Sequence, residues 1–188
     1  MYNVALLVDR FYPMLGGAEI ASYLLANKLQ ELNEVNIFTH CSSKIDKKIN
    51  YPYPVINSGS YSFLTSFINS RNKLAMCKKN KVNILHGMVL HGAGFSSIEL
   101  KKKLKLPLVS HARGSDVQFV EEINYGALLD SNLKSKVQST VDYSNKIIVL
   151  SQLNKSYLLN NFLCDERKVE VIPNGIDINR INKIQNYD

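Results

Sequence analysis

A run of polar residues follows an apolar segment near the middle of the chain. The segment 108–110 leads directly into His111, Arg113, Ser115 and Asp116. Packing of an apolar strand needs none of these side chains, whereas histidine and arginine bind hydroxyl and phosphate groups. The carboxylate of Asp116 can bind hydroxyl groups, orient Arg113, or cap the next helix. We predict His111, Arg113 and Asp116 as candidate catalytic residues and Ser115 as a binding residue.

Two adjacent glycines, Gly16 and Gly17, separate the first apolar segment from the first amphipathic one. Glycine lets a ligand approach the backbone closely, and the amides at a helix start favour an anion such as a diphosphate. A tight turn without a chemical role explains the pair equally well. The spacing differs from the GxGxxG dinucleotide signature, and the second predicted strand lacks the acidic residue that this signature expects.

Other turns carry weaker signals. Asn174 and Gly175 follow a proline, which indicates a turn in any protein. His86 and His91 end another apolar segment, but their spacing is not that of a helical metal-binding pair. We interpret them as loop or buried histidines, and we expect no metal and no cofactor.

The elements that must position these residues are predicted from hydrophobic periodicity. Apolar or β-branched segments predict strands at 4–8, 35–39, 55–56, 82–86, 108–110, 146–150 and 168–172. Amphipathic segments predict helices at 18–32, 61–79, 95–105 and 119–143, with a break near Tyr125-Gly126, and one more after an N-cap at Ser151.

Strands that alternate with helices predict an α/β fold, a Rossmann-like, doubly wound parallel sheet with helices on both faces. Ligands bind such sheets at the carboxyl ends of the strands. The polar and glycine-rich turns should therefore gather along one edge.

Composition fits one folded domain. The chain has 188 residues, of which 45% are hydrophobic, and its Cys41, Cys77 and Cys164 form no CxxC pair. We expect reduced, mostly buried thiols in a cytosolic protein. The apolar run at 4–8 lacks the features of a secretory signal, and no apolar stretch reaches the roughly 20 residues that span a bilayer.

The net charge of +7 comes from short lysine runs at 44–48, 78–81 and 101–105. Such runs are either solvated helix ends and loops or contacts to an anionic surface. Of anionic partners we favour a membrane or a lipid-linked acceptor over nucleic acid, because no stacking aromatic pattern accompanies the lysines. The segment 61–81, with Phe63, Leu64, Phe67 and Ile68 at helical spacing, is either a core-facing helix or an interfacial one.

Taken together, the motifs resemble the N-terminal domain of retaining nucleotide-sugar glycosyltransferases of the GT-B fold, family 4. The family pattern P-x-x-G-G-x-E is matched by Pro13, Gly16, Gly17 and Glu19, and V-I-P-N-G-[IV]-D by residues 171–177. The H-G-x-D region corresponds to residues 113–116, and V-S to Leu150-Ser151. The resemblance covers nearly the whole chain.

The resemblance implies transfer of a sugar from a nucleotide-sugar donor to a glycan or lipid-linked acceptor, with retained configuration. Residues 1–177 would form the acceptor-side domain, and 178–188 a linker toward a C-terminal donor-binding domain. The enzyme would be cytoplasmic or peripheral on the inner face of the membrane. The chain by itself is expected to be inactive, because the donor half supplies most of the stabilisation of the leaving phosphate.

Site roles follow from the same resemblance. Residues that bind donor or acceptor would be Gly16, Gly17, Glu19, Ser115, Ser151, Asn174 and Gly175. The family histidine is replaced by Arg113, so either Arg113 or His111 takes its role. Two alternatives stay open: a stand-alone acceptor-binding or scaffold module that pairs with a separate donor-domain chain, and another GT-B enzyme such as a nucleotide-sugar epimerase.

Overall fold

One parallel sheet organises the protein, as a computed structural model shows for residues 1–39, 49–57, 63–175 and 178. Within these residues the sheet has seven strands, in the order β3-β2-β1-β4-β5-β6-β7. The strands are β1 (Asn3–Val8), β2 (Glu34–Thr39), β3 (Val55–Asn57), β4 (Ile84–Met88), β5 (Leu108–His111), β6 (Lys146–Val149) and β7 (Val169–Val171). The predicted Rossmann-like, doubly wound α/β fold is confirmed.

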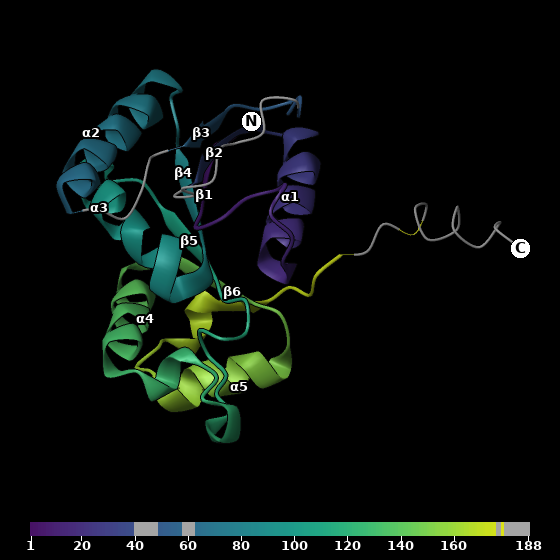
Figure 1. Cartoon of the computed structure of the whole chain (residues 1–188), viewed down its shortest axis with the longest axis vertical. Helices are drawn as coiled ribbons and strands as arrows, with labels where there is room; N and C mark the ends of the chain where they lie inside the picture. The colour runs from purple at the N-terminus through teal and green to yellow at the C-terminus, as the bar shows by residue number, and fades with distance from the viewer. Residues whose placement is uncertain (40–48, 58–62, 176–177, 179–188) are drawn as a thin grey trace, which may run out of the picture.

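Helices follow most strands (Figure 1). They are α1 (Gly17–Gln30), α2 (Phe63–Lys79), α3 (Phe95–Leu104), α4 (Ser131–Tyr143) and α5 (Gln152–Asn161). Shorter turns are the π-helical η1 (Val89–Gly94) and the 3₁₀ turns η2 (Glu121–Ile123), η3 (Ala127–Leu129) and η4 (Glu166–Lys168).

The core has two layers because successive side chains of a strand point to opposite faces. Leu6 and Val8 of β1 pack in the cluster that holds α1, whereas Ala5 and Leu7 pack in the cluster that holds α2 and α3. The register of neighbouring strands shows that Ile147 of β6 points to the same face of the sheet as Ala5 of β1.

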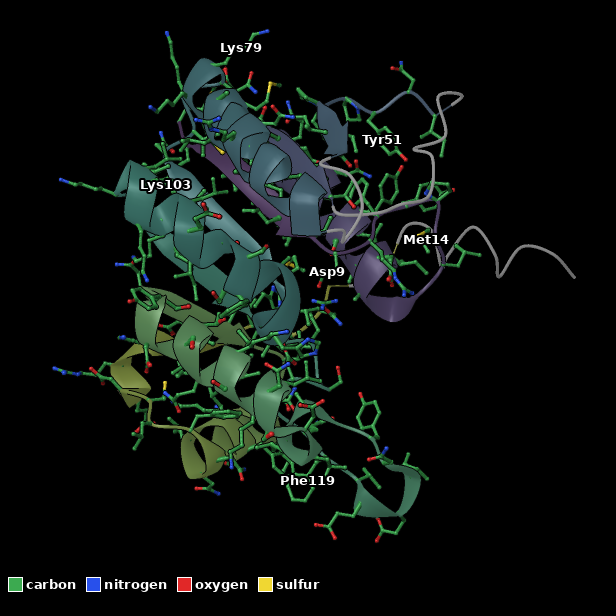
Figure 2. The ribbon with its side chains drawn as sticks, turned by 60° about the vertical axis from the view of Figure 1, so that its left-hand side comes forward. Asp9, Met14, Tyr51, Lys79, Lys103 and Phe119 are labelled. Carbon is green, nitrogen blue, oxygen red and sulfur yellow. The ribbon has the colours of Figure 1, made fainter. Side chains whose placement is uncertain are left out.

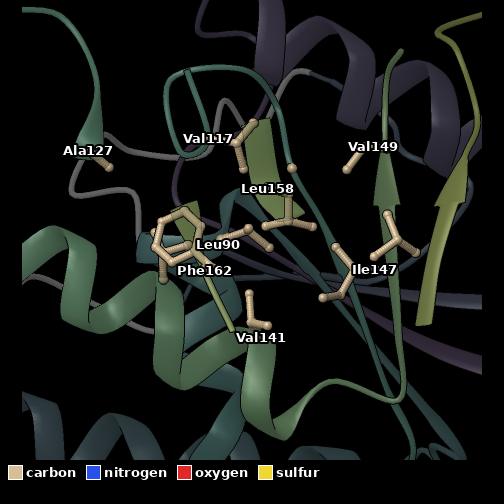
Figure 3. Close-up of a cluster of buried hydrophobic side chains, with 11 residues drawn as sticks. Leu90, Val117, Ala127, Val141, Ile147, Val149, Leu158 and Phe162 are labelled. Atoms are coloured by element: carbon tan, nitrogen blue, oxygen red, sulfur yellow. The ribbon is translucent and has the colours of Figure 1, made fainter. Parts of the chain in front are cut away.

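The α4 and α5 helices cover the same face as α2 and α3. Val141 of α4 and Leu158 of α5 pack with Ile147, and Phe162 closes this cluster (Figure 3). The α1 helix therefore lies on one face of the sheet, and α2 to α5 lie on the other.

The predicted helix at 119–143 is wrong over its first half. Residues 120–129 form η2, η3 and a bridge between Val120 and Tyr125, and the helix begins only at Ser131. Gly126 has φ +114°, and a Cβ there would lie 2.1 Å from the carbonyl oxygen of Gln118. The Asp130 carboxylate then caps α4 by accepting from the Asn132 and Leu133 amides at 2.8 and 3.0 Å.

Smaller differences concern β4 and the segment after it. The β4 strand begins at Ile84 rather than Val82, because the Val82 amide donates to the carbonyl oxygen of Cys77 in the turn that follows α2. Residues 89–94, expected as a loop, form η1. Cys77 is buried as predicted, and burial raises the pKa of its thiol to about 11.

Several predictions fall outside the described residues. These are Cys41, the lysine run at 44–48, the start of the helix at 61, the side chains of the apolar stripe Phe63, Leu64, Phe67 and Ile68, and the linker beyond Ile178. None of the described helices is both long enough and apolar enough to cross a membrane.

Candidate functional site

The strand order reverses between β1 and β4, since β1 leads outward to β2 on one side and pairs with β4 on the other. In an open parallel sheet, such a reversal leaves a crevice at the carboxyl ends of the strands. The loops that follow β1, β4, β5, β6 and β7 all begin at this edge.

Aromatic side chains hold the loop that connects β1 to α1. Phe11 is buried, and the ring of Tyr12 stacks on Tyr23 of α1 at a centroid distance of 4.7 Å. The Tyr51 hydroxyl donates to the carbonyl oxygen of Tyr12 at 2.6 Å. These contacts fix the middle of the loop, and the loop then leads directly into the start of α1.

The two glycines of this loop have different surroundings. A Cβ at Gly16 would lie 2.2 Å from Oε2 of Glu19, so the Glu19 carboxylate packs back over the helix start. A Cβ at Gly17 would meet no atom within 4 Å. Gly17 therefore leaves open space in front of the first amides of α1, where an anion binds favourably.

Two carboxylates hold η1 from opposite sides. Asp9, directly after β1, accepts through Oδ2 from the Ala93 amide at 3.1 Å, and Asp116 accepts through Oδ2 from the Leu90 amide at 2.9 Å. A side chain at Gly92 would displace the Asp9 carboxylate from this position, because a Cβ would lie 1.9 Å from its Oδ2. The loops after β1, β4 and β5 are thereby joined into one structure.

The Asp116 carboxylate also organises its own loop. It is fully buried, and its Oδ1 accepts from the backbone amides of Arg113 and Gly114 at 2.9 and 3.0 Å. Burial raises the pKa of Asp116, and the bonds from Leu90 and Arg113 oppose that rise. This geometry favours orientation of the Arg113 segment among the roles considered for Asp116, and its catalytic role stays a prediction.

Arg113 joins the loop after β5 to the segment after β7. Its Nη1 donates to Oδ1 of Asn174 at 3.0 Å and lies 3.3 Å from Nε2 of His111. Arginine can only donate, so Nε2 of His111 accepts and the neutral ring carries its proton on Nδ1. Burial, helped by the nearby His86 and Arg113, lowers the pKa of His111 to about 3. His111 is therefore neutral near pH 7, and Arg113 supplies the positive charge.

His86 lies beneath this pair. Its ring stacks on His111 with a centroid distance of 5.7 Å, and burial lowers its pKa to about 4. Within the described part of the chain, Nε2 of His86 and Nδ1 of His111 have no hydrogen-bond partner. The interpretation of His86 as a buried histidine is confirmed, and the described residues contain no group of three or more metal-binding side chains.

The other predicted residues lie at the same edge. Ser151 caps α5, as predicted, by accepting from the Asn154 amide at 3.1 Å. A Cβ at Gly175 would meet no atom within 4 Å. Ser115 borders a pocket of about 600 Å³ with His91, Asn124, Gly126, Ala127, Leu129, Asp130, Ser131 and Leu133.

The predicted residues thus form two groups. Hydrogen bonds connect the first group, which consists of His111, Arg113, Asp116 and Asn174. The second group consists of Gly16, Gly17 and Glu19. Among the contacts of the described residues, the second group is linked to the first only indirectly, through Asp9 in the same loop and through η1. Asp9 was missed as a site residue, although an acidic residue directly after a fully buried strand is a usable signal. Nothing in the sequence predicted that η1 would offer its amides to both carboxylates.

Comparison with known proteins identifies relatives of this arrangement. The model of Glycosyltransferase Family 4 matches residues 15–180. No curated protein matches the chain.

Solved structures share the fold at low sequence identity. Alr3699/HepE from Anabaena, in complex with UDP and glucose, has a TM-score of 0.72 and 16% identity, over 98% of this chain and 50% of that one. Sucrose-phosphate synthase from Thermosynechococcus elongatus has a TM-score of 0.76 and 16% identity, over 95% and 49%. UDP-GlcNAc 2-epimerase from Methanocaldococcus jannaschii has a TM-score of 0.61 and 14% identity, over 93% of this chain and 46% of that one. The chain spans about half the length of these structures.

Proposed function

Since the chain belongs to Glycosyltransferase Family 4, we propose that it forms the acceptor-side half of a GT-B glycosyltransferase. This enzyme moves a sugar from a nucleotide-sugar donor to a glycan or lipid-linked acceptor, with retained configuration. Residues 1–177 form the acceptor-side domain, and the segment from 178 onward leads to a donor-binding domain.

One observation carries the proposal: a continuous row of contacts runs along the carboxyl edge of the sheet. Asp9 binds Ala93, Asp116 binds Leu90, and Arg113 binds Asn174. These contacts connect the loop before α1 with the guanidinium of Arg113. That loop ends at Gly17, where the start of α1 is open. A helix start and an arginine at one rim are suited to a ligand that carries both phosphate and hydroxyl groups.

The chemistry that we assign to this rim is electrostatic. When the bond between the sugar and the diphosphate breaks, negative charge develops on the leaving phosphate oxygen. The acceptor hydroxyl oxygen forms the new bond to the sugar, and its proton passes to the leaving diphosphate. Backbone amides at the start of α1 and the Arg113 guanidinium stabilise such charge from fixed positions. The proposal needs no metal ion or other cofactor from this half.

Comparisons support the transferase over the epimerase alternative. The epimerase from Methanocaldococcus jannaschii shares the fold, but the family model that matches this chain is that of glycosyltransferases. Alr3699/HepE was solved with UDP and glucose, which is consistent in kind with a nucleotide-sugar donor. The lysine runs favour a cytoplasmic enzyme that is peripheral on the inner face of the membrane.

The proposed function can be tested by combining this chain with a donor-binding domain. The chain is coexpressed with, or fused to, the donor-binding domain of a family 4 enzyme, and the release of UDP from UDP-sugars is measured with a panel of acceptors. We expect release only when both halves are present, with product of retained configuration. Turnover by either half alone would contradict the proposal that both halves are needed for activity. A folded pair that turns over no donor would contradict the proposed glycosyltransferase activity.

A further inference from the structure

The pocket that Ser115 borders, with its volume of about 600 Å³, lies beside the loop that carries Arg113. One side of it is made by the excursion formed by residues 118–130, and the other by η1, Ser115 and the start of α4. In Figure 2 the excursion projects from the body of the domain next to Phe119, at the end of the molecule far from Lys79. The volume falls within the roughly 300 to 1,000 Å³ that small-molecule sites in proteins occupy.

This pocket shares residues with the rim that holds Arg113. His91 belongs to η1, the turn that Asp9 and Asp116 hold from opposite sides. Ser115 lies two residues after Arg113 in the same loop. A ligand in the pocket would therefore lie next to the loop whose guanidinium we assign to the donor diphosphate.

Hydrogen bonds hold the walls of the pocket in place. The Ala127 amide donates to the carbonyl oxygen of Ser115 at 2.7 Å, which fixes the excursion against the Arg113 loop. Oγ1 of Thr140 donates to the carbonyl oxygen of Leu90 at 2.8 Å, which fixes η1 against α4. Leu90 and Ala127 also pack in one buried cluster (Figure 3). The pocket is therefore formed before a ligand arrives, which lowers the cost of binding.

Several polar side chains of the lining remain available to a ligand. His91 and Ser115 are partly exposed, and Asn124 and Ser131 are exposed. In the part of the chain that the structure describes, none of these side chains makes a hydrogen bond. The Asp130 carboxylate caps α4 through Oδ1 alone, so Oδ2 keeps its capacity to accept. Donors and acceptors of these kinds recognise hydroxyl groups.

The charge of the lining disfavours an anion. Among the described residues that border the pocket there is no lysine or arginine, and Asp130 contributes a carboxylate. A phosphate group would therefore meet a like charge without a fixed cation to balance it. Leu129 and Leu133 add apolar surface, against which the C–H face of a sugar ring can pack. The lining suits a neutral, hydroxyl-rich ring better than a phospholipid headgroup.

We propose that this pocket binds the acceptor, and that the acceptor presents a neutral sugar ring there. The proposal rests on the proposed transferase function, because only that function requires an acceptor next to Arg113. Asn124 of the excursion and Ser131 of α4 then determine specificity by contacting hydroxyl groups of the ring. A lipid-linked acceptor fits the pocket only through a sugar of this kind and not through its phosphate.

Sugar binding can be measured by NMR titration of the isotope-labelled chain, which needs neither donor nor activity. The probes are methyl glycosides of glucose, galactose, mannose and N-acetylglucosamine, with glycerol 3-phosphate as the anionic comparison. We expect at least one glycoside to cause saturable shifts of the Ser115, Asn124 and Ser131 amides, and glycerol 3-phosphate to cause none. The proposal is overturned if no glycoside causes saturable shifts, or if glycerol 3-phosphate causes the same ones.

The pocket variant Asn124→Gly/Ser131→Ala should weaken glycoside binding about tenfold. Glycine suits the positive φ of Asn124, and alanine is a good helix former, so the fold should be kept. The matched control is Lys105→Gly/Gln152→Ala, because Lys105 has a similar positive φ and Gln152 begins α5 as Ser131 begins α4. Neither control residue lines the pocket, so affinity should change by less than about twofold. Equal losses in both variants, or unchanged affinity in the pocket variant, contradict the proposal.

Kinetics of the two-domain assembly separate the acceptor pocket from the transferase function itself. With an acceptor that gives turnover, the pocket variant should raise the KM for the acceptor about tenfold and leave the KM for the nucleotide-sugar donor within about twofold of wild type. An active assembly whose acceptor KM is unchanged in this variant would overturn the pocket and leave the transferase intact. An inactive assembly whose chain still binds glycosides would refute the transferase and with it the acceptor role of the pocket.

Discussion

Arg113 and Asn174 are 61 residues apart in the sequence, yet Nη1 of Arg113 lies 3.0 Å from Oδ1 of Asn174. The contact ties the loop after β5 to the segment after β7. It also bears on which residue takes the place of the family histidine. Arg113 is only partly buried at the rim, whereas His111 is buried beneath it and accepts a hydrogen bond from it. We expect Arg113 to contact substrate and His111 to position Arg113.

The first prediction concerns Arg113. In the two-domain assembly, Arg113→Ala should lower kcat/KM about 100-fold, because a fixed cation near the developing charge is lost. Arg113→Lys should restore only part of the lost kcat/KM. Lysine keeps the positive charge but cannot bind His111 and Asn174 with one planar group. Initial rates of UDP release would measure both variants. The exposed Lys134→Ala on α4 is the control, and full activity of a folded Arg113→Ala protein would contradict the assignment.

The second prediction concerns Gly17. Gly17→Val should leave the free energy of unfolding within about 1 kcal/mol of wild type, because a Cβ there meets no protein atom within 4 Å. Its branched side chain should block the diphosphate and raise the KM for the donor. Urea denaturation and donor titration separate the two effects. Ala75→Val, at an exposed position of α2, adds a similar side chain far from the rim and should leave KM unchanged. An unaltered KM in Gly17→Val would remove this loop from the mechanism.

The third prediction concerns Asp116. Asp116→Asn should lower the free energy of unfolding by roughly 3 kcal/mol, because an amide nitrogen would face backbone N–H groups that need an acceptor. Chemical denaturation measures this loss. Asp130→Asn is the matched control, since asparagine caps a helix about as well as aspartate at this exposed N-cap. Similar, small effects at both positions would show that Asp116 does not hold the loop.

The fourth prediction concerns the stacked histidines. The unfolded chain binds a proton at each histidine near pH 6.5, whereas folded His86 and His111 do so only near about pH 4 and 3. Between these values the unfolded state holds more protons, so the free energy of unfolding falls as the pH falls. The expected slope is up to about 1.4 kcal/mol per pH unit for each histidine.

His86→Phe isolates one of these contributions. Asp9 and Asp116 act in the opposite direction, because their pKa values are raised, and they contribute equally to wild type and variant. The difference in unfolding free energy should therefore shift in favour of the variant as the pH is lowered from about 7 to 5. Urea titrations at several pH values measure it. Parallel pH curves for the two proteins would show that His86 is not kept neutral by the fold.

The sequence predicted the sheet well because each strand contains at least two apolar residues and β1 and β6 carry nearly continuous apolar runs. Ile147 and Val149, for example, belong to a short apolar and β-branched run that is typical of a buried strand. The edge at which the polar turns gather follows from the parallel topology. The helix at 119–130 was wrong for a related reason. Val120 and Ile123 mimic an apolar stripe, but Ile123 is 72% exposed and packs against no core. Periodicity records spacing and not whether a partner surface exists.

The contacts inside the site were less predictable. That Asp116 would bind the Leu90 amide depends on how two loops meet in space, and local sequence patterns contain no such information. The exchange of histidine for arginine at position 113 was visible, but its consequence became clear only when Asn174 was found within reach of the guanidinium.

The excursion between Gln118 and Asp130 has a practical consequence for engineering. It is closed at its base, where the Ala127 amide donates to the carbonyl oxygen of Ser115 at 2.7 Å, and it is pinched by the bridge between Val120 and Tyr125. The tip contributes no strand to the sheet. We therefore expect that foreign loops can be grafted between Val120 and Tyr125 while the rest of the domain folds as before.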